Sequence, residues 1–418
     1  MQEITDIRVN ADRLLVDLQD LAQIGKTDDG GVTRISFSDA DLQARAWFQK
    51  RVLQAGLKFH QDGAGNLFAR FPDWDSQSPA LLLGSHMDTV LNGGKYDGAL
   101  GSLSALEVMR TIQEWNMKLP INLEAVVFSD EEGNLMNFLG SSALTGQLSN
   151  KTIEESRVGK EQLLIALQNA GLNEEGLFAA RREKKSLAGY LEVHIEQGNR
   201  LLKAQAQVGV VNSIVGIRSY RVQFLGRADH AGTMSMKDRR DAAQGAAALI
   251  TKAHDLVLQR YPEDVCTVGW VNLVPGTVNV IPERAELTLE FRSANLQRLD
   301  NMDQDLILLI EELAAQLGLS LKMEKIGDHR PAEMSPLVRQ SILEAVRILN
   351  LTSIEMSSGA AHDAQMLAAV CATGLIFVPS EDGASHSPRE YTRDEDCVNA
   401  ANLLLHTALK MIQGGLNE

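Results

Sequence analysis

The stretch ALLLGSHMD (80–88) decides the fold class of this chain. Its first four residues form a continuous apolar run, which is typical of a strand buried on both faces of a sheet. A histidine and a carboxylate follow where that strand would end. Residues 123–128, 190–193 and 375–378 repeat this pattern of an apolar run before a polar cluster. With helices between them, such runs predict an α/β domain with a mostly parallel, helix-flanked sheet whose ligands gather at the carboxyl ends of the strands.

Helical spacing of apolar residues predicts helices over 7–24, 41–55 and 102–115. The pattern changes between residues 213 and 329, where strands and helices alternate in the order β-α-β-β-α-β, the ferredoxin-like arrangement. The expected elements there are strands at 220–225, 267–273, 285–292 and 319–326, and helices at 241–259 and 296–317. We therefore predict a ferredoxin-like α+β domain of residues 213–329, inserted into a larger domain of residues 1–212 and 330–418.

Composition narrows the class of function. The chain has 418 residues, which makes two domains the expectation. Its formal net charge is −15 and it has no block of basic residues, which disfavours nucleic-acid and anionic-membrane binding. No apolar run approaches the roughly 20 residues of a membrane span, and the polar start MQEITDIRVNADRLL predicts no secretory signal. Three cysteines without a CxxC pair fit a reducing compartment, so we expect a cytoplasmic protein.

Five residues at the ends of these apolar runs are candidate metal ligands. They are His86, Asp97, Glu132, His194 and His386. Imidazole and carboxylate ligands suit zinc, manganese, cobalt or nickel. Asp97 lies in the glycine-rich segment GGKYDGA (93–99), where the backbone can approach a site closely and present a carboxylate to two cations. Each residue alone could be a polar strand end, a turn aspartate or a hydrogen-bonded loop histidine, but together they form a ligand set for two ions.

Two further carboxylates stand beside the candidate ligands. On an extended segment, His86 and Asp88 would point to the same side, and a carboxylate can orient an imidazole through its second nitrogen. Glu131 and Glu132 are adjacent and would point to opposite sides. One of them could therefore bind metal while the other acts as a general base. The alternative is a solvated acidic turn.

At these residues the chain resembles the dinuclear metallohydrolases of the aminoacylase and carboxypeptidase type. Within that group it is similar to the amidases that act on ureido compounds: N-carbamoyl-L-amino-acid hydrolases, allantoate amidohydrolases and ureidoglycolate amidohydrolases. The resemblance covers nearly the whole chain. Its segments are GSHMDTVLNGGKYDG (84–98), DEEG (130–133), EVHIEQG (192–198), GVVNSIVG (209–216), DHAGT (229–233), RRDA (239–242), TVNVIP (277–282), the strand with Arg292, AHDAQ (361–365) and SHSP (385–388).

The resemblance implies two divalent metal ions per subunit, zinc or manganese, with cobalt or nickel as alternatives. The implied ligands are His86, Asp97 and His194 for one ion, and Asp97, Glu132 and His386 for the other. Asp88 would orient His86, and Glu131 would be the general base.

The resemblance also gives the inserted domain a role as a lid that pairs two subunits, so we expect a homodimer. His230 would reach the partner's active site and polarise the scissile carbonyl. Gln197, Asn279 and Arg292 would hold the substrate, with Arg292 on its carboxylate, because a guanidinium donates two parallel hydrogen bonds. His362 would be a further histidine on the substrate side.

The expected function is metal-dependent hydrolysis of a linear amide or ureido C–N bond in a small carboxylate such as an N-carbamoyl-L-amino acid or allantoate. A dipeptidase or an N-acyl-amino-acid deacylase is an alternative within the same fold. A metal-free binding protein is an alternative of another class. The chain departs from the amidase branch at residues 134–138, where the branch has Ser-Arg-Phe, and at Ala361 and Ser387. These departures leave the substrate open.

Overall fold

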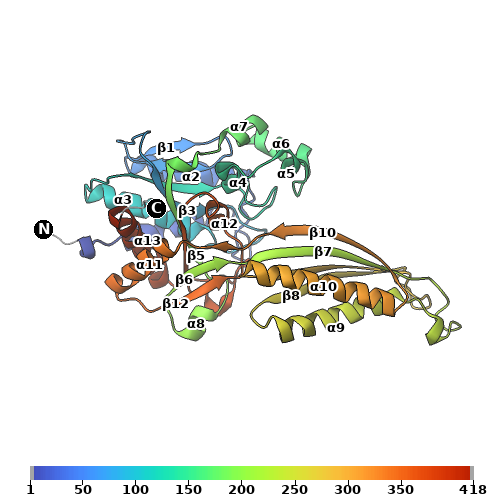
Figure 1. Cartoon of the computed structure of the whole chain (residues 1–418). Helices are drawn as coiled ribbons and strands as arrows, with labels where there is room; N and C mark the ends of the chain where they lie inside the picture. The colour runs from blue at the N-terminus through green and yellow to red at the C-terminus, as the bar shows by residue number, and fades with distance from the viewer. Residues whose placement is uncertain (1–3, 415–418) are drawn as a thin grey trace. The chain divides into compact units, whose positions relative to one another are not determined.

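The computed structural model describes residues 4–414 (Figure 1). These residues fall into two compact units. The smaller unit is Ser213–Ala332, and the larger unit consists of the residues before and after it.

The larger unit contains a nine-stranded sheet in the order β1-β2-β4-β3-β5-β13-β6-β11, with β12 paired to β6. Its strands are β1 (Lys58–Gln61), β2 (Leu67–Arg70), β3 (Ala80–His86), β4 (Asn122–Phe128), β5 (Leu187–Ile195), β6 (Val208–Ile214), β11 (Ala332–Glu333), β12 (Ser353–Ser358) and β13 (Thr373–Val378). The four central strands β4, β3, β5 and β13 run parallel to one another. Antiparallel pairs flank them, namely β2 with β4 and β13 with β6.

The central strands are mostly apolar and buried, as expected of strands covered on both faces of the sheet. All seven residues of β3 are buried, and so are all six of β13. Gly84 lets β3 approach β4, since a Cβ at this position would overlap the carbonyl oxygen of Val126. Such close parallel packing places the ends of β3, β4, β5 and β13 at one edge of the sheet, which is where the candidate ligands come together.

Eleven helices of the described chain belong to the larger unit. They are α1 (Ala11–Leu21), α2 (Asp39–Gln54), α3 (Ala99–Glu114), α4 (Leu139–Thr145), α5 (Asn150–Glu154), α6 (Lys160–Asn169), α7 (Glu174–Ala179), α8 (Arg200–Ala204), α11 (Pro336–Leu349), α12 (Asp363–Leu367) and α13 (Asp394–Gly414). Helix α3 packs against β3, β4 and β5, and every residue from Ala99 to Ile112 is buried. Most of these residues are apolar or small, and the buried charges of Glu107 and Arg110 pair with each other.

The smaller unit is a four-stranded antiparallel sheet in the order β10-β7-β9-β8, with α9 and α10 packed on one face (Figure 1). Its elements are β7 (Gly216–Leu225), α9 (Ala242–Arg260), β8 (Val265–Val274), β9 (Arg284–Ser293), α10 (Leu296–Gln316) and β10 (Ser320–His329). Alternate residues of β9, including Leu287, Leu289 and Phe291, are buried against the helices. The prediction of a helix-flanked, mostly parallel sheet with an inserted ferredoxin-like domain is confirmed.

Local differences from the expected elements have local causes. Helix α1 begins later than expected because the Asn10 side chain accepts a hydrogen bond from Arg13 N and caps the helix there.

Among residues 4–414, none of the helices combines the length and the apolar character that a membrane crossing requires.

Candidate metal centre

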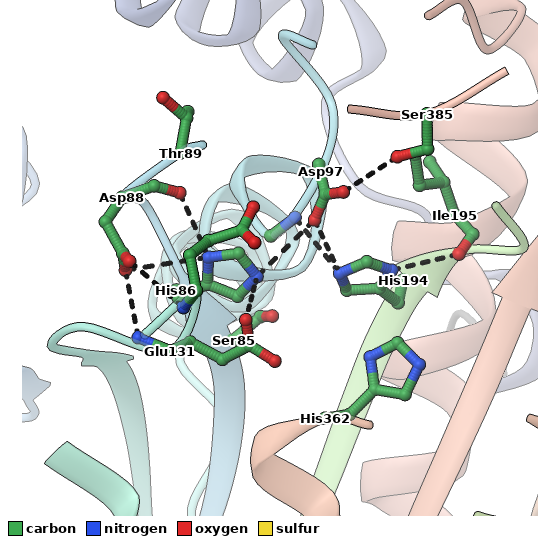
Figure 2. A network of polar contacts seen from close by, with 12 residues as sticks. Ser85, His86, Asp88, Thr89, Asp97, Glu131, His194, Ile195, His362 and Ser385 are labelled. Carbon is green, nitrogen blue, oxygen red and sulfur yellow. Dashed lines mark hydrogen bonds and ion pairs between the residues drawn. The ribbon is translucent and has the colours of Figure 1, made fainter. Parts of the chain in front are cut away.

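Two histidines and one aspartate meet at the carboxyl ends of neighbouring strands. His86 is the last residue of β3, and His194 lies near the end of β5. Because β3 and β5 are adjacent and parallel, the two imidazole rings stack with centroids 5.8 Å apart. Asp97 lies in the loop before α3, and its carboxylate points toward both rings (Figure 2).

In the neutral form of each imidazole, the nitrogen that faces Asp97 carries no hydrogen. Nδ1 of His86 lies 3.1 Å from the carbonyl oxygen of Asp88, and Nδ1 of His194 lies 2.9 Å from that of Ile195. A carbonyl oxygen only accepts, so both Nδ1 atoms carry the ring hydrogen. Both Nε2 atoms therefore offer a lone pair, at 3.5 Å (His86) and 3.0 Å (His194) from Asp97 Oδ1.

The other oxygen of Asp97 faces a second group of ligands. Its Oδ2 atom lies 3.4 Å from Nε2 of His386, which in turn lies 3.6 Å from Oε2 of Glu132. In each group, the three candidate ligand atoms lie within 4.8 Å of one another. The structure thus brings the five predicted ligands together as two triads that share Asp97.

These triads fit divalent metal ions in spacing and in chemistry. Two atoms bound at about 2.1 Å to one tetrahedral ion lie about 3.4 Å apart, which is close to the separations between the paired ligand atoms here. Nε2 of His86 is buried and has no hydrogen-bond partner among the described residues. Burial would lower the pKa of His86, but surrounding carboxylates, Glu131 first, outweigh it and raise this pKa well above the usual value. The position therefore favours a cation.

Asp88 contacts both His86 and the segment that carries the two glutamates. Its carboxylate lies 3.6 Å from His86 Nδ1, beyond hydrogen-bond distance, and the hydrogen bond of that nitrogen goes to the main-chain oxygen of Asp88. The same carboxylate accepts hydrogen bonds from the backbone N–H of Glu131 (3.4 Å) and of Glu132 (3.2 Å). Asp88 thereby links the end of β3 to the segment after β4.

Glu131 and Glu132 have different neighbours. Oε2 of Glu131 lies 3.5 Å from Nε2 of His86, whereas Glu132 faces His386. This backbone is not the extended segment that we expected, since Asp130 has a φ of +53°. Burial, followed by nearby carboxylates, raises the pKa of Glu131 well above its usual value and that of Glu132 to about 8.

Two predicted substrate residues lie beside the triads. Nε2 of Gln197 donates a hydrogen bond to Asp97 Oδ2 at 2.7 Å. His362 packs edge-on against His194 with centroids 4.5 Å apart (Figure 2). Burial, followed by the charge of His194, holds the pKa of His362 well below its usual range. A buried neutral imidazole can donate or accept a hydrogen bond with substrate.

The other three predicted substrate residues belong to the smaller unit. His230 and Asn279 lie on neighbouring segments, because the backbone N–H of Ala231 donates to the carbonyl oxygen of Asn279 at 3.0 Å. Arg292 lies near the end of β9, where its Nε donates to Oε1 of Glu290 at 2.9 Å. The arginine side chain is 32% exposed.

Residues 134–138, which depart from the amidase branch, contact a loop that carries a ligand. Nδ2 of Asn134 donates to the carbonyl oxygen of Thr89 at 3.1 Å. The backbone N–H of Met136 donates to Asp130 Oδ2 at 2.6 Å. Residues 134–138 are therefore hydrogen-bonded both to the loop after β3 and to Asp130, the residue before Glu131.

Sequence reasoning missed two buried side chains that hold ligand segments. Nε of Arg34 donates to the carbonyl oxygen of Met87, between His86 and Asp88, at 2.6 Å. Glu390 accepts hydrogen bonds from the loop that carries Asp97. Neither residue belongs to a local motif, and their only sequence signal is a charged residue in a stretch that the fold buries.

Comparisons with known proteins agree with this geometry. An N-carbamoyl-L-amino acid amidohydrolase from Geobacillus stearothermophilus is 36% identical over 408 residues, which cover 97% of this chain and 100% of that protein. An allantoate amidohydrolase from Bacillus subtilis (strain 168) is 34% identical over 378 residues, or 89% of this chain and 90% of that protein. The crystal structure of an amidase of the hydantoinase/carbamoylase family from Burkholderia multivorans superposes with a TM-score of 0.87 at 32% identity, covering 97% of this chain and 98% of that chain.

The resemblance predicted from the sequence motifs is thereby confirmed. Residues 82–410 match the model of the peptidase family M20/M25/M40, and this range includes every predicted ligand. By that match and by its near-full-length relatives, the chain belongs to the peptidase family M20/M25/M40.

Proposed function

We propose that this chain is a metal-dependent amidohydrolase that cleaves a linear ureido or amide C–N bond in a small carboxylate substrate. The substrates we favour are N-carbamoyl-L-amino acids and allantoate. Two relatives are named for these activities, and this chain aligns with 90% or more of the length of each. The observation that carries the proposal is the shared carboxylate of Asp97 between two ligand triads, with Glu131 beside them.

The two triads would hold two divalent ions, with zinc and manganese as the first choices and cobalt or nickel as alternatives. When bound, such ions supply Lewis acidity and lower the pKa of a water molecule between them. His86 and His194 would present Nε2 to one ion, since their Nδ1 hydrogens are held by main-chain carbonyls. Glu132 and His386 would complete the other.

The residues of the chain account for the proton transfers. Glu131 removes a proton from the attacking water, and the oxygen of that water bonds to the carbonyl carbon. Glu131 then gives this proton to the departing nitrogen as the C–N bond breaks. With a ureido substrate the products are an amine, ammonia and carbon dioxide.

Substrate recognition falls to the remaining predicted residues. Arg292 would bind the substrate carboxylate through two parallel hydrogen bonds, and Asn279, Gln197 and His362 would hold the rest of the substrate. His230 of the partner subunit would donate to the carbonyl oxygen as negative charge develops there.

The assembly we infer is a homodimer formed through the smaller unit. Strand β8 is an edge strand of that unit's sheet, and it exposes several large apolar side chains. These are Val265, Trp270, Val271 and Leu273. An exposed apolar edge strand is a template for pairing with another chain.

The cysteines Cys266, Cys371 and Cys397 are free, in keeping with the cytoplasmic location that we infer.

A substrate panel tests the proposal against its alternatives. The purified protein, loaded with manganese or zinc, would be given allantoate, ureidoglycolate and a set of N-carbamoyl-L-amino acids, alongside N-acetyl amino acids and dipeptides. Ammonia release from a ureido substrate supports the proposal. Cleavage of only the acetyl compounds or the dipeptides would point to a deacylase or a dipeptidase instead.

A further inference from the structure

The buried carboxylate of Glu390 contacts two loops of the candidate metal centre. One loop carries Asp97, which both triads share, and the other carries His386, the most exposed candidate ligand. Glu390 is 2% exposed. Its Oε1 atom accepts hydrogen bonds from the backbone N–H of Tyr96 (2.8 Å) and of Asp97 (3.1 Å). Its Oε2 atom lies 2.9 Å from Oγ of Ser385, the residue before His386. A single side chain thus spans segments almost 300 positions apart in the sequence.

The loop of Asp97 is built around this carboxylate. A Cβ at Gly94 would overlap the carboxyl group of Glu390, so only glycine leaves room for it. The serine hydroxyl also contacts the ligand directly, since Ser385 Oγ lies 2.9 Å from Asp97 Oδ2 (Figure 2). Glu390 therefore holds Asp97 through its backbone, and the single hydroxyl hydrogen of Ser385 lies within reach of both carboxylates.

The two triads depend on this arrangement to different degrees. His86 and His194 lie on paired strands, whose position the sheet already determines. By contrast, Asp97 and His386 lie on loops, and His386 is half exposed. Loops lack a ladder of backbone hydrogen bonds, so side-chain contacts must set their positions.

We propose that Glu390 is a positioning residue that aligns Asp97 with His386 and thereby creates the second metal position. This inference rests on the proposed function, because it assumes that the triads bind metal. Groups that orient ligands without touching the ion typically change metal affinity by about 10–100-fold. Loss of Glu390 should therefore weaken binding at the triad of Asp97, Glu132 and His386 by that factor. The ion held by His86, Asp97 and His194 should be weakened less, because two of its three ligands lie on paired strands.

The test is a calorimetric titration of metal-free full-length protein with zinc chloride, together with a melting temperature for each variant. Wild type should bind two ions, and His386→Ala should bind one, which identifies the second position. Glu390→Ala should bind the second ion about 10–100-fold more weakly and should lose less affinity for the first ion. Glu390→Gln should restore the second ion, because the amide keeps an acceptor for the two N–H groups and a donor for Ser385.

Two more variants keep the test informative if Glu390→Ala does not fold. Ser385→Ala removes only the link to the His386 loop, and Gly94→Ala displaces the carboxyl group without removing it. Both variants should weaken binding of the second ion more than binding of the first ion. Glu395→Gln is the matched control, because it removes an exposed acid five positions away and should bind both ions as wild type does.

The outcomes separate this inference from the proposed function. One outcome is that wild type binds two ions while Glu390→Ala and Ser385→Ala bind the second ion as tightly as wild type does. In that case Glu390 is not a positioning residue, and the proposed function stands. Equal weakening of both ions would also contradict the inference. A wild type that binds neither zinc nor manganese would instead contradict the proposed function.

Discussion

Glu131 and Glu132 are neighbours in the chain, yet their carboxylates face different histidines. Glu131 lies 3.5 Å from Nε2 of His86, and Glu132 lies 3.6 Å from Nε2 of His386. Asp88 holds the backbone between them, because it accepts hydrogen bonds from the N–H groups of both glutamates. We propose that Glu131 transfers the proton and that Glu132 binds metal.

Exchanging each glutamate for alanine should separate those two roles. Glu131→Ala should lower kcat by at least about 10²–10⁴-fold, the usual contribution of a general base, with metal content unchanged. Glu132→Ala should lose one ion per subunit. Metal analysis by mass spectrometry beside steady-state kinetics checks both. Loss of metal from Glu131→Ala would reassign this residue as a ligand.

Arg292→Ala should lower kcat/KM for carboxylate substrates. A hydrogen bond to a charged group contributes about 1.5–3 kcal/mol, so the expected loss is about 10–150-fold. Arg284→Ala is the control, because this arginine is exposed at the start of the same strand. The kinetics should be repeated with an amide analogue of the substrate carboxylate, on which Arg292→Ala should have little effect. Equal losses on both compounds would remove Arg292 from carboxylate binding.

Mixing two inactive variants tests whether active sites are shared between subunits. His230→Ala leaves Glu131 intact, and Glu131→Ala leaves His230 intact. In a mixed dimer, one site would regain both groups if His230 acts across the interface. Random exchange should then restore about a quarter of wild-type activity, since half of the dimers are mixed and each has one complete site. Activity that never exceeds that of the separate variants would place both residues in the same subunit's site.

Removing the metal ions should abolish activity and lower the melting temperature. A ligand that binds only the folded protein stabilises it by about 2.7 kcal/mol at a concentration 100 times its Kd. Dialysis against a chelator should therefore lower the melting temperature, and adding manganese or zinc should restore both stability and activity. A fully active metal-free protein would contradict the assignment of the triads.

The parts of the fold that the sequence predicted are those with strong local patterns. Two strands can be recognised directly from their residues. The continuous apolar run at 80–83 indicates a strand buried on both faces. The alternation of apolar and polar residues in β9 indicates a strand buried on one face. The ligands followed from these strands, since the carboxyl ends of parallel strands meet at one edge of the sheet. The five ligand side chains do meet there.

Other parts depend on contacts between distant segments. Strand β1 is short and mostly exposed, so its sequence has little periodicity. Glu390 resembles any acid in a polar stretch until the fold brings it to Tyr96 and Asp97. The roles of Asn279 and Arg292 remain predictions, because they depend on a bound substrate.

Ammonia release is the measurement that tests the central claim most directly. Protein loaded with manganese or zinc would be incubated with an N-carbamoyl-L-amino acid and, separately, with allantoate, using Glu131→Ala protein as the blank. We predict that at least one of the two substrates yields ammonia in proportion to its amine product and that the blank yields none. If wild-type protein with both metal positions filled releases no ammonia from either substrate, the assignment as a ureido amidohydrolase is wrong.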